Sequence, residues 1–261
     1  MLDYCYHTHT YRCGHADGKA EEYVLKAIEY GYKVIGFTDH LFIEGFVQPG
    51  IRGDYDELDD YINEINELKT KYKDKIEIKL GFECEYIPWL KDYYKFLLEE
   101  KGFDYLIVGQ HLFLEEDRTY KWVGEYQDKY FALNKYVNHI IEAMSTGLFK
   151  YIAHPDMFVR MFSCFDEEIT KQCEKICKAS LEYDIPLEIN LGGIRGTRVF
   201  KPGQMNYAND TFFKIASKYG CKVIIGVDAH NPNDLAHITS LELGQKFVED
   251  FKLNEIKRLE F

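Results

Sequence analysis

Histidines and carboxylates stand at the C-terminal ends of six short apolar segments of this chain. These metal-binding residue types extend from residue 7 to residue 230 and are His7, His9, Asp39, His40, Glu83, His111, His154, Asp228 and His230. Each apolar segment is typical of a buried strand in a parallel sheet. Imidazole and carboxylate groups together are the ligands that borderline divalent metal ions bind. The pattern therefore predicts a metal centre, if the fold brings these strand ends together.

The number of donors indicates more than one ion. Seven of the nine histidines lie at or just beyond a strand end, including His15 in the loop after the first strand. Any one of them is compatible with a hydrogen-bonded core histidine. Burying all of them with the carboxylates and no counter-ions would cost on the order of several kcal/mol each. One tetrahedral ion takes roughly four ligands, so two or three ions are predicted, with a carboxylate such as Glu83 bridging two of them.

A multinuclear centre of this kind suits the hydrolysis of phosphate esters. Divalent ions generate hydroxide near neutral pH and neutralise charge on the transferring phosphoryl group. Nitrogen and oxygen ligands suit zinc, manganese and iron alike, so the residue types leave the metal open. We expect Glu83, Asp228 and His230 to take part most directly in catalysis.

Arginine placement supports a phosphate substrate, because the guanidinium group binds phosphate in a bidentate manner. Six of the seven arginines follow predicted strands, and some of these are ordinary surface residues. Arg160, Arg195 and Arg198 are the strongest candidates for substrate binding. Arg195 lies in a glycine-rich turn, NLGGIRG, after a strand that ends in Asn190 and offers no metal ligand at its tip. That loop is therefore available to the substrate.

An alternation of strands and helices positions these residues. Seven strands are predicted, at about 3–7, 33–38, 76–83, 104–110, 150–154, 186–190 and 222–228. Helical patterns lie between and after them, at about 19–30, 54–72, 89–101, 126–147, 166–184, 208–219 and 239–250. Such an order predicts a parallel sheet with helical crossovers. Seven units predict a single α/β domain over residues 1–261, a distorted (β/α)7 barrel with the metal site at its C-terminal mouth.

Composition limits the partners. The formal net charge of the 261 residues is −12, which argues against nonspecific binding of nucleic acid through a basic face. The N-terminus, MLDYCYHTHT, carries charge and histidine too early for a signal peptide, and no apolar segment approaches the roughly 18 residues of a membrane span. The odd, dispersed set of seven cysteines favours reduced thiols. A cytoplasmic protein that acts on a small molecule, without a membrane partner, is predicted.

Seven motifs resemble those of the PHP superfamily (polymerase and histidinol phosphatase) and follow that family's order. They are HTHT, CGHADG, FTDH, GFECEY, GQH, AHPD and GVDAH, and they span nearly the whole chain. The length, the CGHADG–EEYV segment and the GGIRG loop are most similar to the monofunctional histidinol-phosphatase branch. The resemblance implies a distorted seven-stranded barrel with a trinuclear metal site. It also implies hydrolysis of L-histidinol phosphate to L-histidinol and phosphate, a step of histidine biosynthesis.

The resemblance further implies how the ligands are shared among three ions. One ion would take His7, His9, Glu83 and Asp228; a second Glu83, His111 and His154; and a third His15, His40 and His230. Asp39 and Asp17 would orient imidazoles, with Asp17 also open as a direct ligand. Arg160 and Arg195 match the branch's phosphate-binding positions. The segment after Arg195 departs from the branch because it lacks the expected Tyr-Pro pair.

Surfaces for the non-phosphate end of the substrate are expected in three places. They are the aromatic, glycine-containing loop 41–53, which also suits a lid, and the surroundings of Trp89 and Phe113.

Two other functions fit parts of the pattern. A PHP-type nuclease or nucleotide phosphoesterase would share the metal site, but a longer basic groove is expected of it, and the charge of −12 disfavours one. A non-catalytic metal-binding or polymerase-associated module tends to lose ligands, whereas every ligand motif is present here. A metal-dependent phosphomonoesterase is therefore the predicted function.

Overall fold

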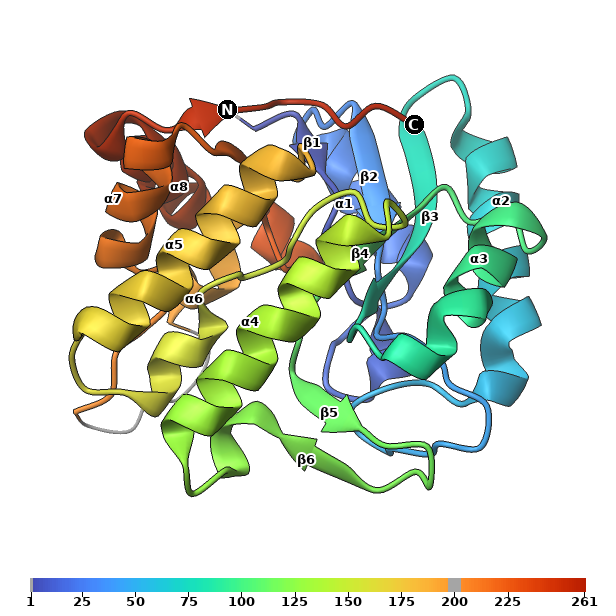
Figure 1. Cartoon of the computed structure of the whole chain (residues 1–261). Helices are drawn as coiled ribbons and strands as arrows, with labels where there is room; N and C mark the ends of the chain where they lie inside the picture. The colour runs from blue at the N-terminus through green and yellow to red at the C-terminus, as the bar shows by residue number, and fades with distance from the viewer. Residues whose placement is uncertain (1, 197–202) are drawn as a thin grey trace.

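The computed structural model describes residues 2–196 and 203–261, with parallel strands at the centre and helices around them (Figure 1). The central strands are β1 (Tyr4–Cys5), β2 (Val34–Phe37), β3 (Glu77–Cys84), β4 (Tyr105–Val108), β7 (Leu187–Asn190), β8 (Lys222–Gly226) and β9 (Asn254–Glu255). A separate antiparallel hairpin consists of β5 (Leu112–Leu114) and β6 (Tyr120–Trp122).

The central strands follow one another around a ring. β1, β2, β3 and β4 pair in parallel in chain order, and β7 pairs in parallel with β8. Ile152 joins the two groups, because it bridges Val108 on one side and Leu187 on the other. Thr8 pairs with Ala229 and so connects the end of β1 to the end of β8. The predicted distorted seven-stranded barrel is confirmed, although the strand expected at 150–154 is reduced to two isolated bridges at Ile152.

Eight helices of the described residues cover the barrel. They are α1 (Ala20–Glu29), α2 (Leu58–Tyr72), α3 (Lys91–Glu99), α4 (Lys129–Ser145), α5 (Glu167–Glu182), α6 (Leu191–Arg195), α7 (Asp210–Tyr219) and α8 (Ile238–Phe251). Short 3-10 turns are η1 (Tyr11–Cys13), η2 (Tyr55–Glu57), η3 (Pro88–Leu90), η4 (Val123–Glu125), η5 (Met157–Met161) and η6 (Pro232–Ala236). The sequence pattern predicts all the helices except α6, a short one that begins where the Asn190 side chain accepts the backbone N–H of Gly193.

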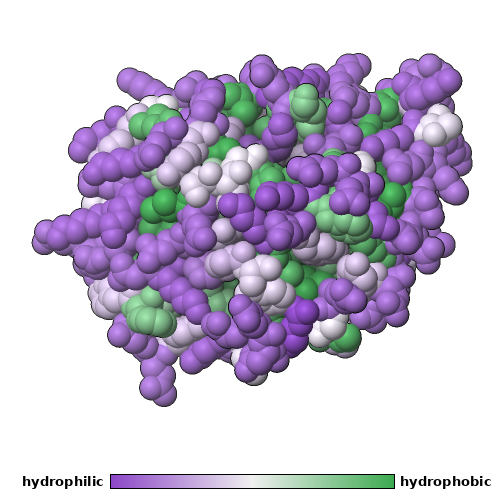
Figure 2. Space-filling model, turned by 45° about the vertical axis from the view of Figure 1, so that its right-hand side comes forward, coloured by the Kyte–Doolittle hydropathy of each residue, from purple (hydrophilic) through white to green (hydrophobic). Residues whose placement is uncertain are grey.

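Burial follows the periodicity of the sequence. β2 and β4 are buried at every position, as expected for parallel strands covered on both faces. On α2 the buried residues recur at helical spacing, from Leu58 through Ile62 and Ile65 to Tyr72. None of the helices in the described part of the chain has the length and hydropathy that a membrane span requires. The face in Figure 2 is largely hydrophilic, with hydrophobic residues scattered among polar ones.

The carboxyl ends of the strands open at one end of the barrel, opposite the two chain termini (Figure 1). The β5–β6 hairpin and the loop 41–53 lie at this open end, which we call the mouth. The two segments contact each other, because the rings of Phe46 and Tyr120 lie 5.3 Å apart. The hairpin was not predicted, since strands of three residues are too short to show an alternating pattern.

Candidate metal centre

The barrel brings all nine predicted metal ligands to the mouth, because each lies at or just after the end of a strand or in the first loop. Seven of them are almost fully buried: His7, His9, His40, Glu83, His111, His154 and Asp228. His230 is partly exposed, and His15 is exposed. The cluster therefore extends from the buried interior of the barrel to its surface.

Glu83 on β3 lies at the centre of this cluster. Its Oε1 lies 2.7 Å from Nε2 of His154 and 3.5 Å from Nε2 of His111. Its Oε2 lies 3.2 Å from Nδ1 of His40 and 3.4 Å from Nε2 of His9. The two oxygens thus face different groups of imidazoles. This is the geometry expected of a carboxylate that bridges two ions.

Asp228 and the outer histidines complete the cluster. Oδ1 of Asp228 lies 3.6 Å from Nε2 of His7, 3.4 Å from Nε2 of His9 and 3.3 Å from Nδ1 of His230. Nε2 of His230 in turn lies 3.0 Å from Nε2 of His15. Ligand atoms of His15, His40 and His230 all lie within 4.8 Å of one another, as do those of His7, His9 and Asp228. The first group has the members that the family resemblance implies for one ion, and the second has three of the four residues that it implies for another. Other groups differ from the implied sharing, since Glu83 also lies with His7 and His154 and with His9 and His40.

The donor set fits divalent ions. Buried polar atoms normally have hydrogen-bond partners. Within the described residues, several buried ring nitrogens of the cluster have none: Nε2 of His7, both nitrogens of His9, Nδ1 of His40, Nε2 of His111 and Nδ1 of His154. Neutral imidazoles and carboxylates gathered at these spacings are what such ions coordinate. The arrangement supports divalent metal binding.

The charges of the cluster depend on one another. Burial would raise the pKa of Glu83, but His111 and His7 outweigh it and hold that pKa well below its ordinary value. Burial would lower the pKa of His7, but the carboxylates of Glu188, Asp228 and Glu83 outweigh it and hold that pKa well above its ordinary value. Glu83 is therefore ionised in the folded protein and is available as a ligand.

Two of the predicted ligands have left-handed backbone conformations. The φ angles of His154 and Asp228 are 30° and 50°. For a residue other than glycine, such a conformation costs roughly 1–3 kcal/mol, and residues in this conformation are concentrated at functional sites. Each lies just after the end of its strand, where an extended backbone would carry the chain past the mouth.

A carboxylate that the sequence analysis missed orients His7. Oε1 of Glu188, in the middle of β7, lies 2.7 Å from Nδ1 of His7. Oε2 accepts hydrogen bonds from the backbone N–H of His154 and from Nδ2 of Asn190. The side chain fits only because residue 226 is glycine, since a Cβ there would overlap Oε1. The hydrogen bond to Nδ1 leaves Nε2 of His7 free to face the centre.

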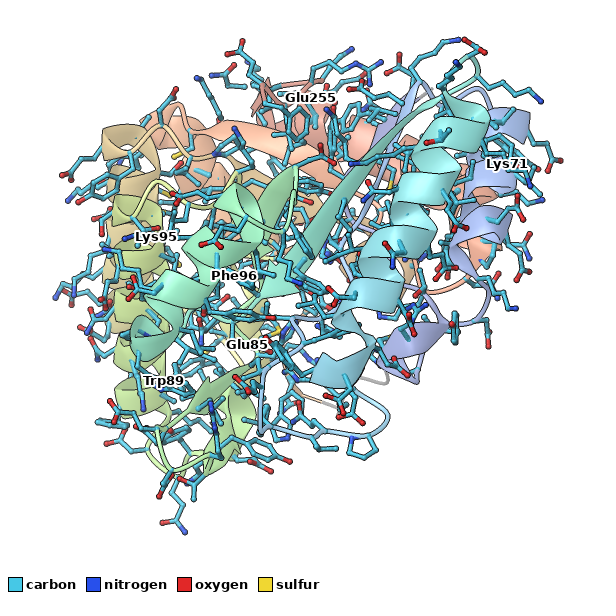
Figure 3. All side chains as sticks on the ribbon, turned by 90° about the vertical axis from the view of Figure 1, so that its right-hand side faces the viewer. Lys71, Glu85, Trp89, Lys95, Phe96 and Glu255 are labelled. Atoms are coloured by element: carbon cyan, nitrogen blue, oxygen red, sulfur yellow. The ribbon has the colours of Figure 1, made fainter. Side chains whose placement is uncertain are left out.

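Glu85 has the same relation to His111. Its Oε1 lies 3.1 Å from Nδ1 of His111. Arg52 donates to both oxygens of Glu85 and to the carbonyl of Leu41. Burial opposes ionisation, but the Arg52 guanidinium outweighs it and lowers the pKa of Glu85 to about 2. Figure 3 shows Glu85 inside the molecule, whereas Lys71 on α2 lies at its outside.

The hydrogen bonds of Asp39 and Asp17 do not show the orienting of imidazoles that was expected of them, and a direct role of Asp17 as a ligand stays a prediction. Asp39 accepts hydrogen bonds from the backbone N–H and the hydroxyl of Thr10, each 2.8 Å long. Asp17 accepts one from the side-chain amide of Asn231. Across the described residues, neither carboxylate accepts a hydrogen bond from an imidazole. Asp39 instead fixes the backbone that follows the His7–His9 segment.

A cavity of about 360 Å³ lies next to His111 and contains one of the predicted phosphate ligands. Its lining includes Arg160 and Lys129 together with the apolar side chains of Met157 and Phe158. Trp122 from the hairpin also contributes, whereas the aromatic residues named in the sequence analysis do not line it. Trp89 instead lies under the Arg118 guanidinium, and Phe113 is buried.

Arg195 is placed differently from Arg160. Its NH1 and NH2 donate to the carbonyls of Val227 and Asp228, both at 2.8 Å. It therefore holds the turn that carries Asp228 and would reach a phosphate only with its remaining N–H groups. Arg198 lies outside the described residues.

Comparisons with known proteins agree with this geometry. The sequence profile of the PHP domain matches residues 6–192. A probable histidinol-phosphatase of Deinococcus radiodurans is 26% identical over 239 residues, which cover 88% of this chain and 86% of that protein. The histidinol-phosphatase of Bacillus subtilis is 25% identical over 259 residues, covering 88% of this chain and 94% of that protein.

Solved structures show the same fold. The histidinol phosphate phosphatase of Lactococcus lactis, solved with zinc, L-histidinol and phosphate, superposes with a TM-score of 0.75 at 19% identity. That match covers 100% of this chain and 99% of that one. A protein from Listeria monocytogenes described as a histidinol phosphatase gives a TM-score of 0.73 at 21% identity, covering 91% of this chain and 99% of that one.

Proposed function

Because the chain belongs to the PHP domain family, we propose that it is a histidinol-phosphatase, which hydrolyses L-histidinol phosphate to L-histidinol and phosphate in histidine biosynthesis. The observation that carries this proposal is the position of Glu83. Its two oxygens face two groups of imidazoles, next to a cavity that contains Arg160. The curated relatives named above support the choice of substrate.

The centre is proposed to hold two to three divalent ions, of zinc, manganese or iron. Zinc in the Lactococcus lactis protein supports zinc among these metals. The residues that would hold the ions are His7, His9, His15, His40, Glu83, His111, His154, Asp228 and His230. Such ions supply a nucleophilic hydroxide near neutral pH and neutralise charge on the phosphoryl group.

Side chains of the protein bind the phosphate group and orient the imidazoles that would hold the ions. Arg160 faces the cavity and is the proposed phosphate ligand, since a guanidinium forms charge-assisted hydrogen bonds to phosphate oxygens. Glu188 and Glu85 each hold one imidazole with its other nitrogen directed at Glu83. Glu83, Asp228 and His230 remain the proposed catalytic residues.

The cavity supports a small-molecule substrate. Its volume of about 360 Å³ lies near the lower end of the range for small-ligand sites. Met157, Phe158 and Trp122 would contact the part of the substrate that carries no phosphate. We place this reaction in the cytoplasm, within a single domain over residues 1–261, and without a nucleic-acid or membrane partner.

One observation favours a second candidate, a phosphoesterase that acts on nucleotides. The described residues that line the cavity include two cations, Arg160 and Lys129, and no carboxylate. A substrate with a second anionic group would suit them, whereas L-histidinol phosphate carries an ammonium group.

A substrate panel separates the two candidates. Phosphate release is measured from L-histidinol phosphate, an aryl phosphate, nucleoside monophosphates and a nucleoside diphosphate, with the same metal-loaded protein. We expect L-histidinol phosphate to have the highest kcat/KM. A higher value for any nucleotide would reject the proposed substrate and retain the metal-dependent chemistry. A parallel series with Lys129→Gln reports whether that cation favours the nucleotides.

A further inference from the structure

Cys13 has a fixed position between two of the predicted metal ligands. It ends the 3-10 turn η1 and lies between His9 and His15 in the chain. Its backbone N–H donates to the carbonyl of Thr10, and its own carbonyl accepts a hydrogen bond from Nδ1 of His15. Asp39 in turn holds Thr10. The position of the Cys13 backbone is therefore determined by the same contacts that shape the mouth.

The burial of this thiol is not explained by apolar packing. Free cysteines are usually buried as small hydrophobic residues. Five of the described cysteines fit that rule and belong to the hydrophobic core: Cys5, Cys84, Cys173, Cys177 and Cys221. Cys13 is fully buried but does not belong to that core. Two polar residues of the mouth, His9 and His230, lie beside its sulfur.

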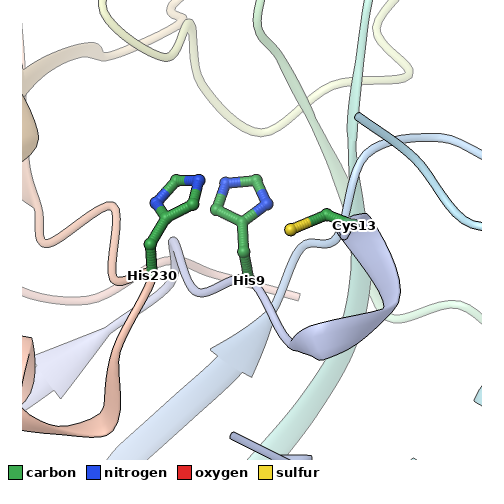
Figure 4. A group of neighbouring side chains, drawn as sticks. All are labelled: His9, Cys13 and His230. Carbon is green, nitrogen blue, oxygen red and sulfur yellow. The ribbon is translucent and has the colours of Figure 1, made fainter. Parts of the chain in front are cut away.

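Two histidines of the cluster lie beside the sulfur. Sγ of Cys13, one ring nitrogen of His9 and one ring nitrogen of His230 all lie within 4.8 Å of one another. Figure 4 shows the sulfur directed towards the ring of His9, with the ring of His230 on the other side of His9. The two imidazole rings are stacked with their centroids 4.3 Å apart.

His9 gives an independent sign of a ligand at this place. The side chain is fully buried, and its Nε2 lies 3.4 Å from both Glu83 and Asp228. Its Nδ1 is also buried and has no hydrogen-bond partner among the described residues. A ligating histidine usually donates its second N–H to a carboxylate, a carbonyl or water. Figure 4 shows Nδ1 of His9 on the side of Cys13.

We propose that Cys13 is a sulfur ligand of the metal centre, in a subsite that it forms with His9 and His230. When a cation binds there, the S–H proton is released to solvent and a sulfur lone pair forms the bond to the ion. This subsite rests on the proposed metal binding and is independent of the identity of the substrate.

A sulfur ligand narrows the choice of metal. Imidazole and carboxylate groups accept zinc, manganese and iron alike, but thiolate favours softer ions. The subsite would therefore bind zinc, cobalt or cadmium in preference to manganese or magnesium. The other seven histidine and carboxylate positions of the cluster would not impose this preference.

Cobalt spectroscopy tests the proposal directly. Metal-free wild-type protein, Cys13→Ser and Cys164→Ser are loaded with Co²⁺, and their absorption is recorded from the near ultraviolet to the visible. Cys164 is the matched control, because it is an exposed free thiol. We expect the sulfur-to-cobalt charge-transfer band of the near ultraviolet in the wild type and in Cys164→Ser. Cys13→Ser should lose this band and keep the weak visible bands of cobalt bound by nitrogen and oxygen.

Two outcomes would overturn the proposal. One is a wild-type protein that is fully loaded with Co²⁺ and shows no charge-transfer band, a result that does not depend on the folding of any variant. The other is an unchanged band in Cys13→Ser.

The affinities for Cd²⁺ and Mn²⁺ show whether Cys13 binds the metal or only shapes its loop. Cys13→Ser should weaken Cd²⁺ binding by about 10- to 100-fold, as lost metal-site groups do, and leave Mn²⁺ binding nearly unchanged. Equal weakening of both ions would show that Cys13 only shapes the loop. Because neither experiment uses a substrate, a protein that shows the band but does not hydrolyse L-histidinol phosphate would reject the proposed function alone.

Discussion

At the scale of single residues, the hydrogen bonds made by the residues behind the predicted ligands should determine how tightly the centre binds metal ions. Oε2 of Glu188 accepts hydrogen bonds from the backbone N–H of His154 and from the side-chain amide of Asn190. A glutamine at position 188 would keep its oxygen there and would therefore direct its amide nitrogen at Nδ1 of His7. That amide donates a proton where the carboxylate accepts one. The imidazole would then have to carry its proton on Nε2, the nitrogen that faces Glu83.

We therefore expect Glu188→Gln to weaken metal binding by about 10- to 100-fold. Competition with a chromophoric chelator measures the affinity, and circular dichroism verifies the fold. Glu182→Gln, at an exposed position on α5, is the control and should bind metal like the wild type. Wild-type affinity in Glu188→Gln would show that Glu188 does not set the orientation of His7.

Substitution of Arg160 and substitution of Arg195 should have different effects on metal content. Arg160→Ala removes a charge-assisted contact to phosphate, which should cost about 2–4 kcal/mol of transition-state stabilisation. That is roughly a 30- to 900-fold loss of kcat/KM, with metal content unchanged. Arg195→Ala removes the donors to the carbonyls of Val227 and Asp228, so metal content should fall as well. Atomic absorption and steady-state kinetics on the same samples distinguish a residue that binds phosphate from one that holds the turn carrying Asp228. A normal metal content in Arg195→Ala would contradict the second role for Arg195.

The clustering of the predicted ligands could be foreseen from the sequence, and the residues behind them could not. The predicted ligands stand at the ends of apolar segments, which the chain order alone reveals, as for Glu83 and Asp228. Which carboxylate forms a hydrogen bond with a given imidazole depends on which strands the barrel brings close together. Glu188 is a single charge inside a buried strand, and only the closeness of β7 to β1 pairs it with His7. A charge inside the segment LEIN was the one available signal.

At the scale of elements, a buried ion pair attaches the loop 41–53 to the centre. The Arg52 and Glu85 side chains are both almost fully buried, and Arg52 also binds the carbonyl of Leu41. Removing one partner of a buried pair leaves an uncompensated charge and costs about 3–5 kcal/mol, whereas removing both costs less.

Arg52→Met should therefore reduce the free energy of unfolding by about 3–5 kcal/mol. The double variant Arg52→Met/Glu85→Gln should recover part of that loss. Urea denaturation of the two variants and of Glu85→Gln completes a double-mutant cycle. If the double variant is no more stable than Arg52→Met, the uncompensated Glu85 charge is not the cause of the loss.

Helices were predicted more closely than strands for a physical reason. The amphipathic repeat of α2 or α5 extends over several turns, so its period is visible in the sequence. The element around Ile152 makes only two single bridges, and β9 has two residues. Their pairing depends on their neighbours in the barrel rather than on their own pattern. The hairpin that supplies Trp122 to the cavity escaped prediction for the same reason.

At the scale of the whole molecule, the predicted metal centre lies across two joins of the barrel that are formed by isolated bridges. One join is the single bridge between Thr8 and Ala229, and predicted ligands lie on both sides of each of these residues. The other is Ile152, two residues before His154. Bound ions would therefore add connections across these joins, the first of which is crossed by the backbone hydrogen bonds from His9 to Ala229 and from Ala229 to His7.

Removing the metal should destabilise the barrel at these joins first. An ion present at about 100 times its dissociation constant stabilises the fold by about 2.7 kcal/mol, so a chelator should lower the Tm measurably. Hydrogen exchange should accelerate at the backbone N–H of His9 and Ala229, which cross the first join, before it changes in β3. Uniform acceleration along the chain, or no change in Tm, would show that the ions do not hold the joins.

A metal titration of activity tests most directly whether this centre hydrolyses L-histidinol phosphate with bound metal ions. Metal-free wild-type protein and Glu83→Gln receive zinc or manganese in small steps, and phosphate release from L-histidinol phosphate is measured at each step. We expect no activity without metal, a rise that levels off after two to three equivalents, and, once metal is present, activity at least ~100-fold lower in Glu83→Gln. Full activity in the metal-free protein, or near-wild-type activity in Glu83→Gln at saturating metal, would contradict this expectation.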